Sequence, residues 1–203
     1  MSPYSPLPKG CVRLLRLLPP AGDKSRIECQ LIACSLLDSR RTHSYEALSY
    51  VWGLEKSIEP IWIDGHELSV GANLHTALSH LRDCFVERIL WIDAICINQR
   101  DGIEKGYQVE SMAKIYAQAS RVIVWLGEAA DDSNHALKAI RRAAEEQDID
   151  FSMHKTRHQA SFAPSNRQLI NSKINNVNQQ AVLALLEREW FQRIWVSSRQ
   201  LAT

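Results

Sequence analysis

The stretch RILWIDAICINQRDGIEKGYQVESMAKIYAQASRVIVWLG, residues 88–127, decides the fold class. It opens and closes with short, dense apolar runs, Arg88–Ile92 and Val122–Leu126, which are typical of buried strands. Between them, apolar residues recur at helical steps of three and four, namely Val109, Met112, Ile115, Tyr116 and Ala119. The order strand, helix, strand favours parallel pairing, so both runs are predicted to be interior strands of a mainly parallel sheet.

The residues upstream predict a helix and a hairpin. The helix should begin at Asn73, a good N-cap residue. Its apolar face consists of Leu74, Ala77, Leu78, Leu81 and Phe85. The hairpin should join Ile61–Ile63 to Glu67–Val70, because the Asp64-Gly65 pair between them is a strong signal for a tight turn.

The N-terminal part contains three more predicted strands, Val12–Leu18, Ile27–Leu37 and Leu48–Val51. The first two should pair antiparallel, because the short segment between them has the composition of a turn. We expect these strands to extend or flank the parallel sheet. The sequence therefore predicts an α/β fold, with a mainly parallel central sheet flanked by helices and with N-terminal antiparallel strands and a hairpin.

The C-terminal part changes character. A helix is predicted from Asp132 to Glu146, with Ala136, Leu137, Ile140 and Ala144 turned inward. Residues 147–178 are polar and too long for an ordinary connection, so we interpret them as a mobile insertion or a lid and expect them to be disordered. A last helix is expected over Ala181–Trp190. We predict a single domain, 1–203, whose parts are the N-terminal strands (1–44), the α/β core (45–146), the insertion (147–178) and a C-terminal helical segment (179–203).

Composition and charge argue against several classes of function. The chain has 24 basic and 23 acidic residues, spread along its length, which gives no support for nucleic-acid binding. No apolar run is long enough for a membrane span, and the proline-broken N-terminus is unlike a secretory signal. The five cysteines fit neither a disulfide framework nor a zinc site, so no metal is expected. We therefore expect a cytoplasmic protein with reduced thiols.

Two motifs each extend past the end of a predicted strand: YEALSYVWG, residues 45–53, ends with Trp52-Gly53 after one strand, and in LWIDAICINQ, residues 90–99, Asp93 and the residues after it follow another. In open parallel sheets, ligands bind in the crevice beyond the carboxyl ends of the strands. We therefore predict a pocket lined by Trp52, Asp93, Asn98 and Gln99, whose carboxylate and amides could hold a nucleotide ribose. No Gly-rich phosphate loop is present, so a Rossmann or P-loop mode of binding is not expected.

A purely structural role for the same residues stays open. Asn98 and Asp101 could cap a turn and the following helix through hydrogen bonds to backbone N–H groups. Trp52 could simply pack at a corner of the chain. Glu104 is interpreted as part of a solvated helix start, and Cys96 as a buried thiol.

The motifs also carry a family resemblance. In order along the chain, the two motifs are joined by NLHTAL from Asn73, EKGYQVESM (residues 104–112), VIVWLG (residues 122–127) and WFQRIWV (residues 190–196). This series, over about residues 45–201, resembles the heterokaryon incompatibility (HET) domain of filamentous fungi. The resemblance implies a signalling domain of fungal non-self recognition and programmed cell death. It would work in the cytoplasm through contacts with other signalling proteins or through self-association.

The HET family is in turn distantly similar to TIR domains, which have a flavodoxin-like parallel sheet and in some members hydrolyse NAD. That similarity implies a TIR/flavodoxin-like fold and an alternative function, a nucleotide glycohydrolase with NAD as substrate rather than as a bound cofactor. The expected catalytic Glu would follow the WFQRIWV segment, where this chain has Ser198 and Arg199. A guanidinium accepts no proton, so catalysis would have to use Glu46 or Asp93 instead.

Relatives of this family continue into further helices beyond the position of Thr203. Together with Arg199, this leads us to expect a truncated or degenerate member of the family, or a misplaced 3′ boundary of the gene.

Overall fold

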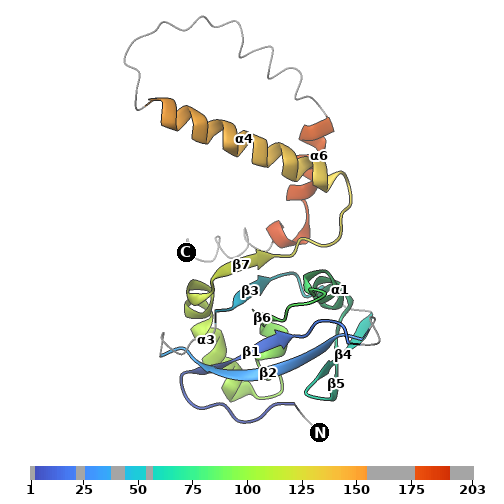
Figure 1. Ribbon diagram of the computed structural model, residues 1–203, viewed down its shortest axis with the longest axis vertical. Helices are drawn as coiled ribbons and strands as arrows, with labels where there is room; N and C mark the ends of the chain where they lie inside the picture. Colours follow the sequence, from blue (N-terminus) through green and yellow to red (C-terminus); the bar gives the residue numbers. More distant parts are fainter. Residues whose placement is uncertain (1–2, 22–25, 38–43, 54–56, 155–176, 193–203) are drawn as a thin grey trace, which may run out of the picture. The chain divides into compact units, whose positions relative to one another are not determined.

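The structure is a computed structural model that describes residues 3–21, 26–37, 44–53, 57–154 and 177–192. The chain divides into two compact units, Met1–Gly127 and Glu128–Thr203. The described part of the first unit holds a seven-stranded sheet in the order β5-β4-β2-β1-β6-β3-β7 (Figure 1). Its strands are β1 (Cys11–Leu17), β2 (Glu28–Ser35), β3 (Glu46–Ser49), β4 (Ile58–Ile63), β5 (His66–Gly71), β6 (Arg88–Trp91) and β7 (Arg121–Val124).

The helices alternate with strands only in the second half of the first unit. This unit contains α1 (Ala72–Leu81), the short α2 (Asp93–Cys96) and α3 (Gly102–Gln118). The second unit contains α4 (Ser133–His154) and α6 (Val177–Leu186), which pack against each other. The α/β class that the sequence predicts is therefore confirmed.

The sheet is mixed, and the predicted mainly parallel sheet is not confirmed. Parallel pairs join β2 to β4, β3 to β6 and β3 to β7, whereas β1–β2, β1–β6 and β4–β5 pair antiparallel. The reason is the position of the N-terminal strands. β1 and β2 pair antiparallel as predicted and extend the sheet beyond β6 rather than flank it, so that they lie between the β4–β5 hairpin and the parallel strands β6, β3 and β7.

One strand predicted to be interior lies at an edge. β6 is interior, as predicted, but β7 pairs with β3 alone among the described strands. The apolar run around β7 serves only one side of the strand: Ile123 and Trp125 pack against the core, whereas Val122 and Val124 are 47% and 40% exposed. The continuous apolar run thus predicted the strand correctly, but the prediction that both faces of the strand are buried was wrong.

Local signals in the first unit are confirmed with two corrections. The β4–β5 turn has positive φ at Asp64 (49°) and Gly65 (79°), as a two-residue hairpin of this kind requires. The N-cap of α1 is Gly71 and not Asn73. Phe85, predicted on the apolar face of α1, lies beyond the end of that helix and is 89% exposed. The Asp83 carboxylate accepts hydrogen bonds from the backbone N–H groups of Phe85 and Val86.

The second unit differs from expectation mainly in the length of α4. This helix begins where predicted and continues to His154, so the start of the 147–178 segment is helical, as are its last two residues in α6. Residues 155–176 lie outside the described residues. On α4, Ala136 is buried, whereas Leu137 and Ile140, predicted to turn inward, are almost half exposed.

Helix α3 is attached to the sheet by polar side chains as well as apolar ones. The buried Tyr45 hydroxyl donates a hydrogen bond to the Ile115 carbonyl, and the Gln108 side-chain amide donates to the Cys11 carbonyl. Both bonds join residues at least 70 positions apart in the sequence. They fix the helix along its length, although Val109, predicted to face inward, is half exposed.

A buried ion pair fixes the start of α3. Arg13 of β1 is 3% exposed and Glu104 is 13% exposed, and two guanidinium nitrogens donate to the two carboxylate oxygens at 2.5 and 3.0 Å. The same guanidinium donates to the carbonyls of Ser5 and Cys96 and lies over the ring of Tyr4. The expectation that Glu104 belongs to a solvated helix start is therefore wrong, because Arg13 supplies a buried partner for it.

We predict that Glu104→Ala strongly destabilises the protein. Removing one partner of a buried pair leaves an uncompensated charge, which typically costs about 3–5 kcal/mol. The free energy of unfolding, measured by urea denaturation, should fall by that amount. Glu110→Ala, at an exposed position of the same helix, is the matched control and should change it by less than about 0.5 kcal/mol. Equal effects of the two variants would contradict the role of the ion pair.

We also predict an acid-sensitive contribution from Glu104. Burial alone raises the pKa of this carboxyl, but the hydrogen bonds from Arg13 and from the Asn98 N–H outweigh burial and hold it below the ordinary value of 4.5. A lowered pKa in the folded state adds stability above the unfolded pKa, and this stability is lost as the pH falls. The difference in unfolding free energy between wild type and Glu104→Gln should therefore shrink below pH 4.5. A difference that stays constant down to about pH 3 would disprove it.

Candidate functional site

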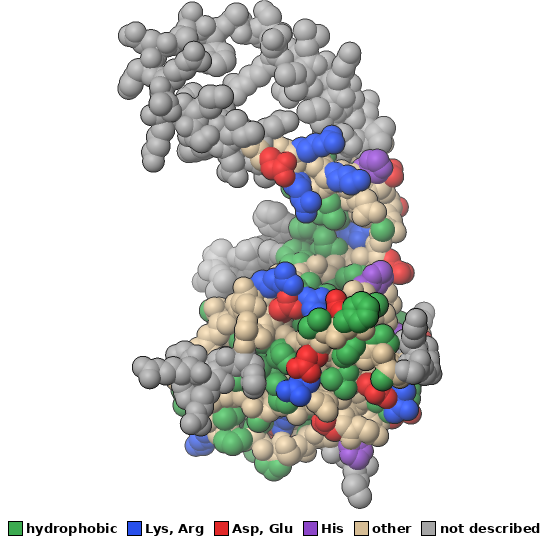
Figure 2. Space-filling model, viewed as in Figure 1, with side chains coloured by type: hydrophobic (Ala, Val, Ile, Leu, Met, Phe, Trp, Pro, Cys, Tyr) green, Lys and Arg blue, Asp and Glu red, His purple; other side chains and the backbone are tan. Residues whose placement is uncertain are grey.

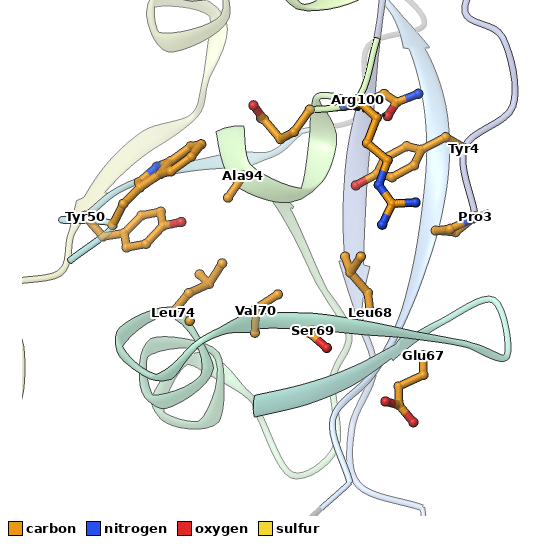
Figure 3. A pocket seen from close by; sticks show the side chains of 14 residues that line it. Pro3, Tyr4, Tyr50, Glu67, Leu68, Ser69, Val70, Leu74, Ala94 and Arg100 are labelled. Carbon is orange, nitrogen blue, oxygen red and sulfur yellow. Dashed lines mark hydrogen bonds between the residues drawn. The ribbon is translucent and has the colours of Figure 1, made fainter. Parts of the chain in front are cut away.

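A cavity of about 690 Å³ opens in the first unit beside β5. Figure 3 shows the side chains of Tyr50, Leu68, Val70, Leu74 and Ala94 around a common space, between β5 and α2. The full lining comprises Pro3, Tyr4, Tyr50, Trp52, Glu67, Leu68, Ser69, Val70, Gly71, Leu74, Ala94, Asn98, Gln99 and Arg100. Its floor is apolar and its rim is polar, which is the composition of a binding pocket.

The two sequence motifs meet at this cavity. The Trp52 indole N–H donates to both carboxylate oxygens of Asp93, at 3.1 Å each. Asp93 is the first residue of α2, and its Oδ1 also accepts the N–H of Ala94. Trp52 lines the cavity and is 39% exposed, whereas Asp93 stands behind it and holds the indole in place.

The Asn98–Gln99 segment forms another wall. The Asn98 side chain accepts a hydrogen bond from the Arg100 N–H, so it stabilises the turn and lines the cavity at the same time. The Gln99 amide donates to the Asp93 carbonyl at 2.9 Å. Asp101 accepts two N–H groups at the start of α3 and is an N-cap, as one of the two interpretations of the sequence had it. The structure thus brings Trp52, Asp93, Asn98 and Gln99 together, and nucleotide binding by them stays a prediction.

Glu46, the other candidate for catalysis, lies elsewhere. It opens β3, whereas Trp52 follows the far end of that strand. Its Oε2 accepts hydrogen bonds from the Arg88 guanidinium at 2.9 and 2.5 Å, and its Oε1 pairs with Arg121. Both oxygens are thus held by guanidinium groups of the neighbouring strands β6 and β7, and Glu46 does not line the cavity. Its carboxylate ties the parallel strands together.

Several residues of the site were not predicted from the sequence. Asn73 donates to the Val51 carbonyl at 2.7 Å and accepts from the Trp125 indole at 2.8 Å, so it joins the ends of β3 and β7. The position of Asn73 in the NLHTAL motif was a signal for such a role, but the sequence analysis interpreted this residue only as an N-cap. Tyr4 donates from its hydroxyl to the Ile95 carbonyl and forms the wall opposite β5. No sequence pattern pointed to it.

The thiol of Cys96, in the second motif, is structural. It is fully buried, and burial raises its pKa to about 12. Thiolate is the reactive form of cysteine, so this group is inert at neutral pH. Within the described ranges, no cluster of His, Cys, Asp and Glu side chains has the makings of a metal site. The described helices are also all too short or too polar to cross a membrane.

Arg199 and most of the WFQRIWV segment lie outside the described residues. Arg199 stands where the family resemblance implies a catalytic Glu, and this difference is known from the sequence alone.

Two comparisons with known proteins point to the same family. The family model described as "Heterokaryon incompatibility protein (HET)" matches residues 45–198. The chain is 43% identical over 116 residues to "Heterokaryon incompatibility protein 6, OR allele" of Neurospora crassa, an alignment that covers 51% of this chain and 17% of that protein. The chain thus matches less than a fifth of that relative's length. No solved structure matches, so the expected likeness to the TIR fold is not confirmed.

The matched region includes both motifs that meet at the cavity and the helix start that the buried ion pair fixes. Its length exceeds half of the chain. The chain therefore belongs to the heterokaryon incompatibility (HET) family.

Proposed function

We propose that this chain is a signalling domain of fungal non-self recognition, whose output is programmed cell death. The observation that carries the proposal is the family match over residues 45–198, the region that supplies Trp52, Asn98 and Gln99 to one cavity and Asp93 as the partner of Trp52. The similar Neurospora crassa protein is by its name a heterokaryon incompatibility protein. The domain would act in the cytoplasm, and all five of its cysteines are free thiols, which suits a reducing compartment.

The domain would act by protein contacts and not by catalysis. Both candidate carboxylates are engaged: Asp93 holds the Trp52 indole, and Glu46 pairs with Arg88 and Arg121. A general base needs a carboxylate within reach of a substrate, and Glu46 does not reach the cavity. The engaged carboxylates therefore favour contact signalling over a TIR-like hydrolysis of NAD.

The partner would be another signalling protein or a second copy of the chain, and not a nucleic acid. On the face of the first unit that Figure 2 shows, Lys and Arg side chains are interspersed with Asp and Glu. The formal net charge of the whole chain is +1. Nucleic-acid binding draws its affinity from a concentrated basic surface, which this face does not offer.

We predict that expression of the chain in a filamentous fungus kills hyphal compartments, and that Trp52→Phe weakens this effect about tenfold. Phe keeps the aromatic ring but loses the N–H that Asp93 accepts, and a hydrogen bond to a charged group contributes about 1.5–3 kcal/mol, less where it is exposed. The measurement is the fraction of compartments stained by a vital dye at equal protein level. Trp62→Phe, on β4, is the matched control and should kill like wild type.

Two results would count against this proposal. Absence of killing by the wild-type chain would contradict the signalling function itself. Killing by Trp52→Phe at the wild-type level would show that the cavity corner is not part of the signalling surface.

We predict further that the purified chain releases no measurable nicotinamide from NAD. Loss of a catalytic carboxylate typically lowers the rate by about two to four orders of magnitude, and Arg199 adds an opposing charge. Turnover restored in Arg199→Glu alone would show that the position belongs to a latent active site. Turnover in the wild type that disappears in Glu46→Gln would contradict the structural role given to Glu46.

A further inference from the structure

Strand β5, beside the cavity, is an edge of the sheet. It pairs with β4 and stands last in the strand order of the described residues. Edge strands carry a row of backbone N–H and C=O groups that no neighbouring strand satisfies, and such a row can accept another strand. In this molecule the edge strand also borders a cavity, since five consecutive residues, 67–71, line that cavity.

The register shows which residues of β5 carry the free row. The backbone N–H of Trp62 in β4 donates to the carbonyl of Ile27, just before β2, so the backbone N–H and C=O of Trp62 point away from β5. Its neighbour Ile61 therefore directs its groups toward β5, where it pairs with Leu68. Because polar groups alternate along a strand, Glu67 and Ser69 direct their N–H and C=O away from β4.

The side chains agree with this orientation. Figure 3 shows Leu68 and Val70 on the cavity side of the strand, whereas the side chains of Glu67 and Ser69 point to the opposite side. Glu67 and Ser69 nevertheless line the cavity. They therefore contribute their backbone to it, at a spacing of about 7 Å, the two-residue repeat of an extended strand.

The remaining walls define what could lie against this row. Tyr50, Leu74 and Ala94 make the depth of the cavity apolar. Arg100 on the rim is exposed, and so is Glu67; neither side chain forms an ion pair with a described residue. An occupant would thus offer backbone groups to β5, an apolar side chain to the depth, and an acidic group near Arg100.

We infer that the cavity beside β5 binds an extended segment of a partner polypeptide, which joins the sheet as an added strand and inserts an apolar side chain. A polypeptide backbone matches the free N–H and C=O groups because it has the same two-residue repeat. This inference deepens the proposed contact signalling and rests on it for its biological meaning.

A second copy of β5 is a poorer occupant. Its Leu68 and Val70 already turn toward their own cavity, so it has no apolar side chain to insert. Two β5 edges could pair only through their backbones.

The test uses the full chain and random peptides of about eight residues displayed on phage. The strongest binder is then synthesised with a fluorescent label, and its Kd is measured by fluorescence anisotropy. Ser69→Pro removes an outward N–H without touching the ladder to β4, and Pro is tolerated at such edge positions. It should weaken binding about tenfold or more, since both a hydrogen bond and the close approach of the peptide are lost. Ser69→Thr keeps the N–H and is the matched control.

A second measurement does not depend on the folding of the variant. Backbone N-methylation, moved one position at a time along the peptide, should weaken binding at every second position, because only alternate N–H groups of an added strand face β5. Loss at every position, or at none, would overturn the inference. So would a library that yields no peptide with a Kd below about 100 µM, or peptides that bind wild type and Ser69→Pro alike.

Three further outcomes distinguish the peptide site from self-association and from the proposed function. A concentration-dependent dimer that Ser69→Pro abolishes would replace the partner peptide by a second copy, and so overturn the inference. Peptide binding without killing of hyphal compartments would contradict the proposed function alone. Killing that persists without any peptide binding would contradict the peptide site alone.

Discussion

The buried pair of Arg13 and Glu104 is the constraint on which the geometry of the first unit depends. It connects the middle of the sheet to the start of α3, and the Glu104 carboxylate also accepts the N–H of Asn98. Through the same guanidinium, the N-terminal segment with Tyr4 and Ser5 is held against the sheet. Two walls of the cavity, the Asn98 turn and Tyr4, thus have one common support. Arg13 Nε, however, is buried without a partner, so the pair carries a cost that a fully satisfied network would not have.

The sequence predicted a feature correctly where the residues that decide it are close together along the chain. The Asp64-Gly65 turn is decided by two adjacent residues that accept positive φ, and the antiparallel β1–β2 pair needs only a short connection. Those features were predicted correctly. The environment of Glu104 depends on Arg13, which lies 91 residues away, and a local pattern of charges and glycines resembles an exposed helix start. The edge position of β7 is equally non-local, because an apolar run does not reveal how many neighbours the strand has.

The candidate site shows the same division. Trp52 and Asp93 come together because each of them follows a strand of the sheet, and that much was inferable from the sequence. Glu46 looked like a candidate for catalysis because it is an acidic residue within a motif. Its role is decided by Arg88 and Arg121, which the strands on either side of β3 bring to its two oxygens. Only the strand order distinguishes a carboxylate that pairs strands from one that faces a ligand, and the strand order was the least predictable part of the fold.

The strand order also has a consequence for how the chain reaches its native state. β1, near the N-terminus, occupies the middle of the sheet and pairs with β6, and β3 pairs with β7 near the end of the first unit. During synthesis, the β1–β2 hairpin emerges from the ribosome long before those partners exist, with both of its outer edges unpaired. Contacts of such high sequence separation close slowly, because a long loop must lose its entropy before they form. The first unit is therefore expected to mature late and as a whole, and its early strands are the part of the nascent chain that most needs protection from aggregation.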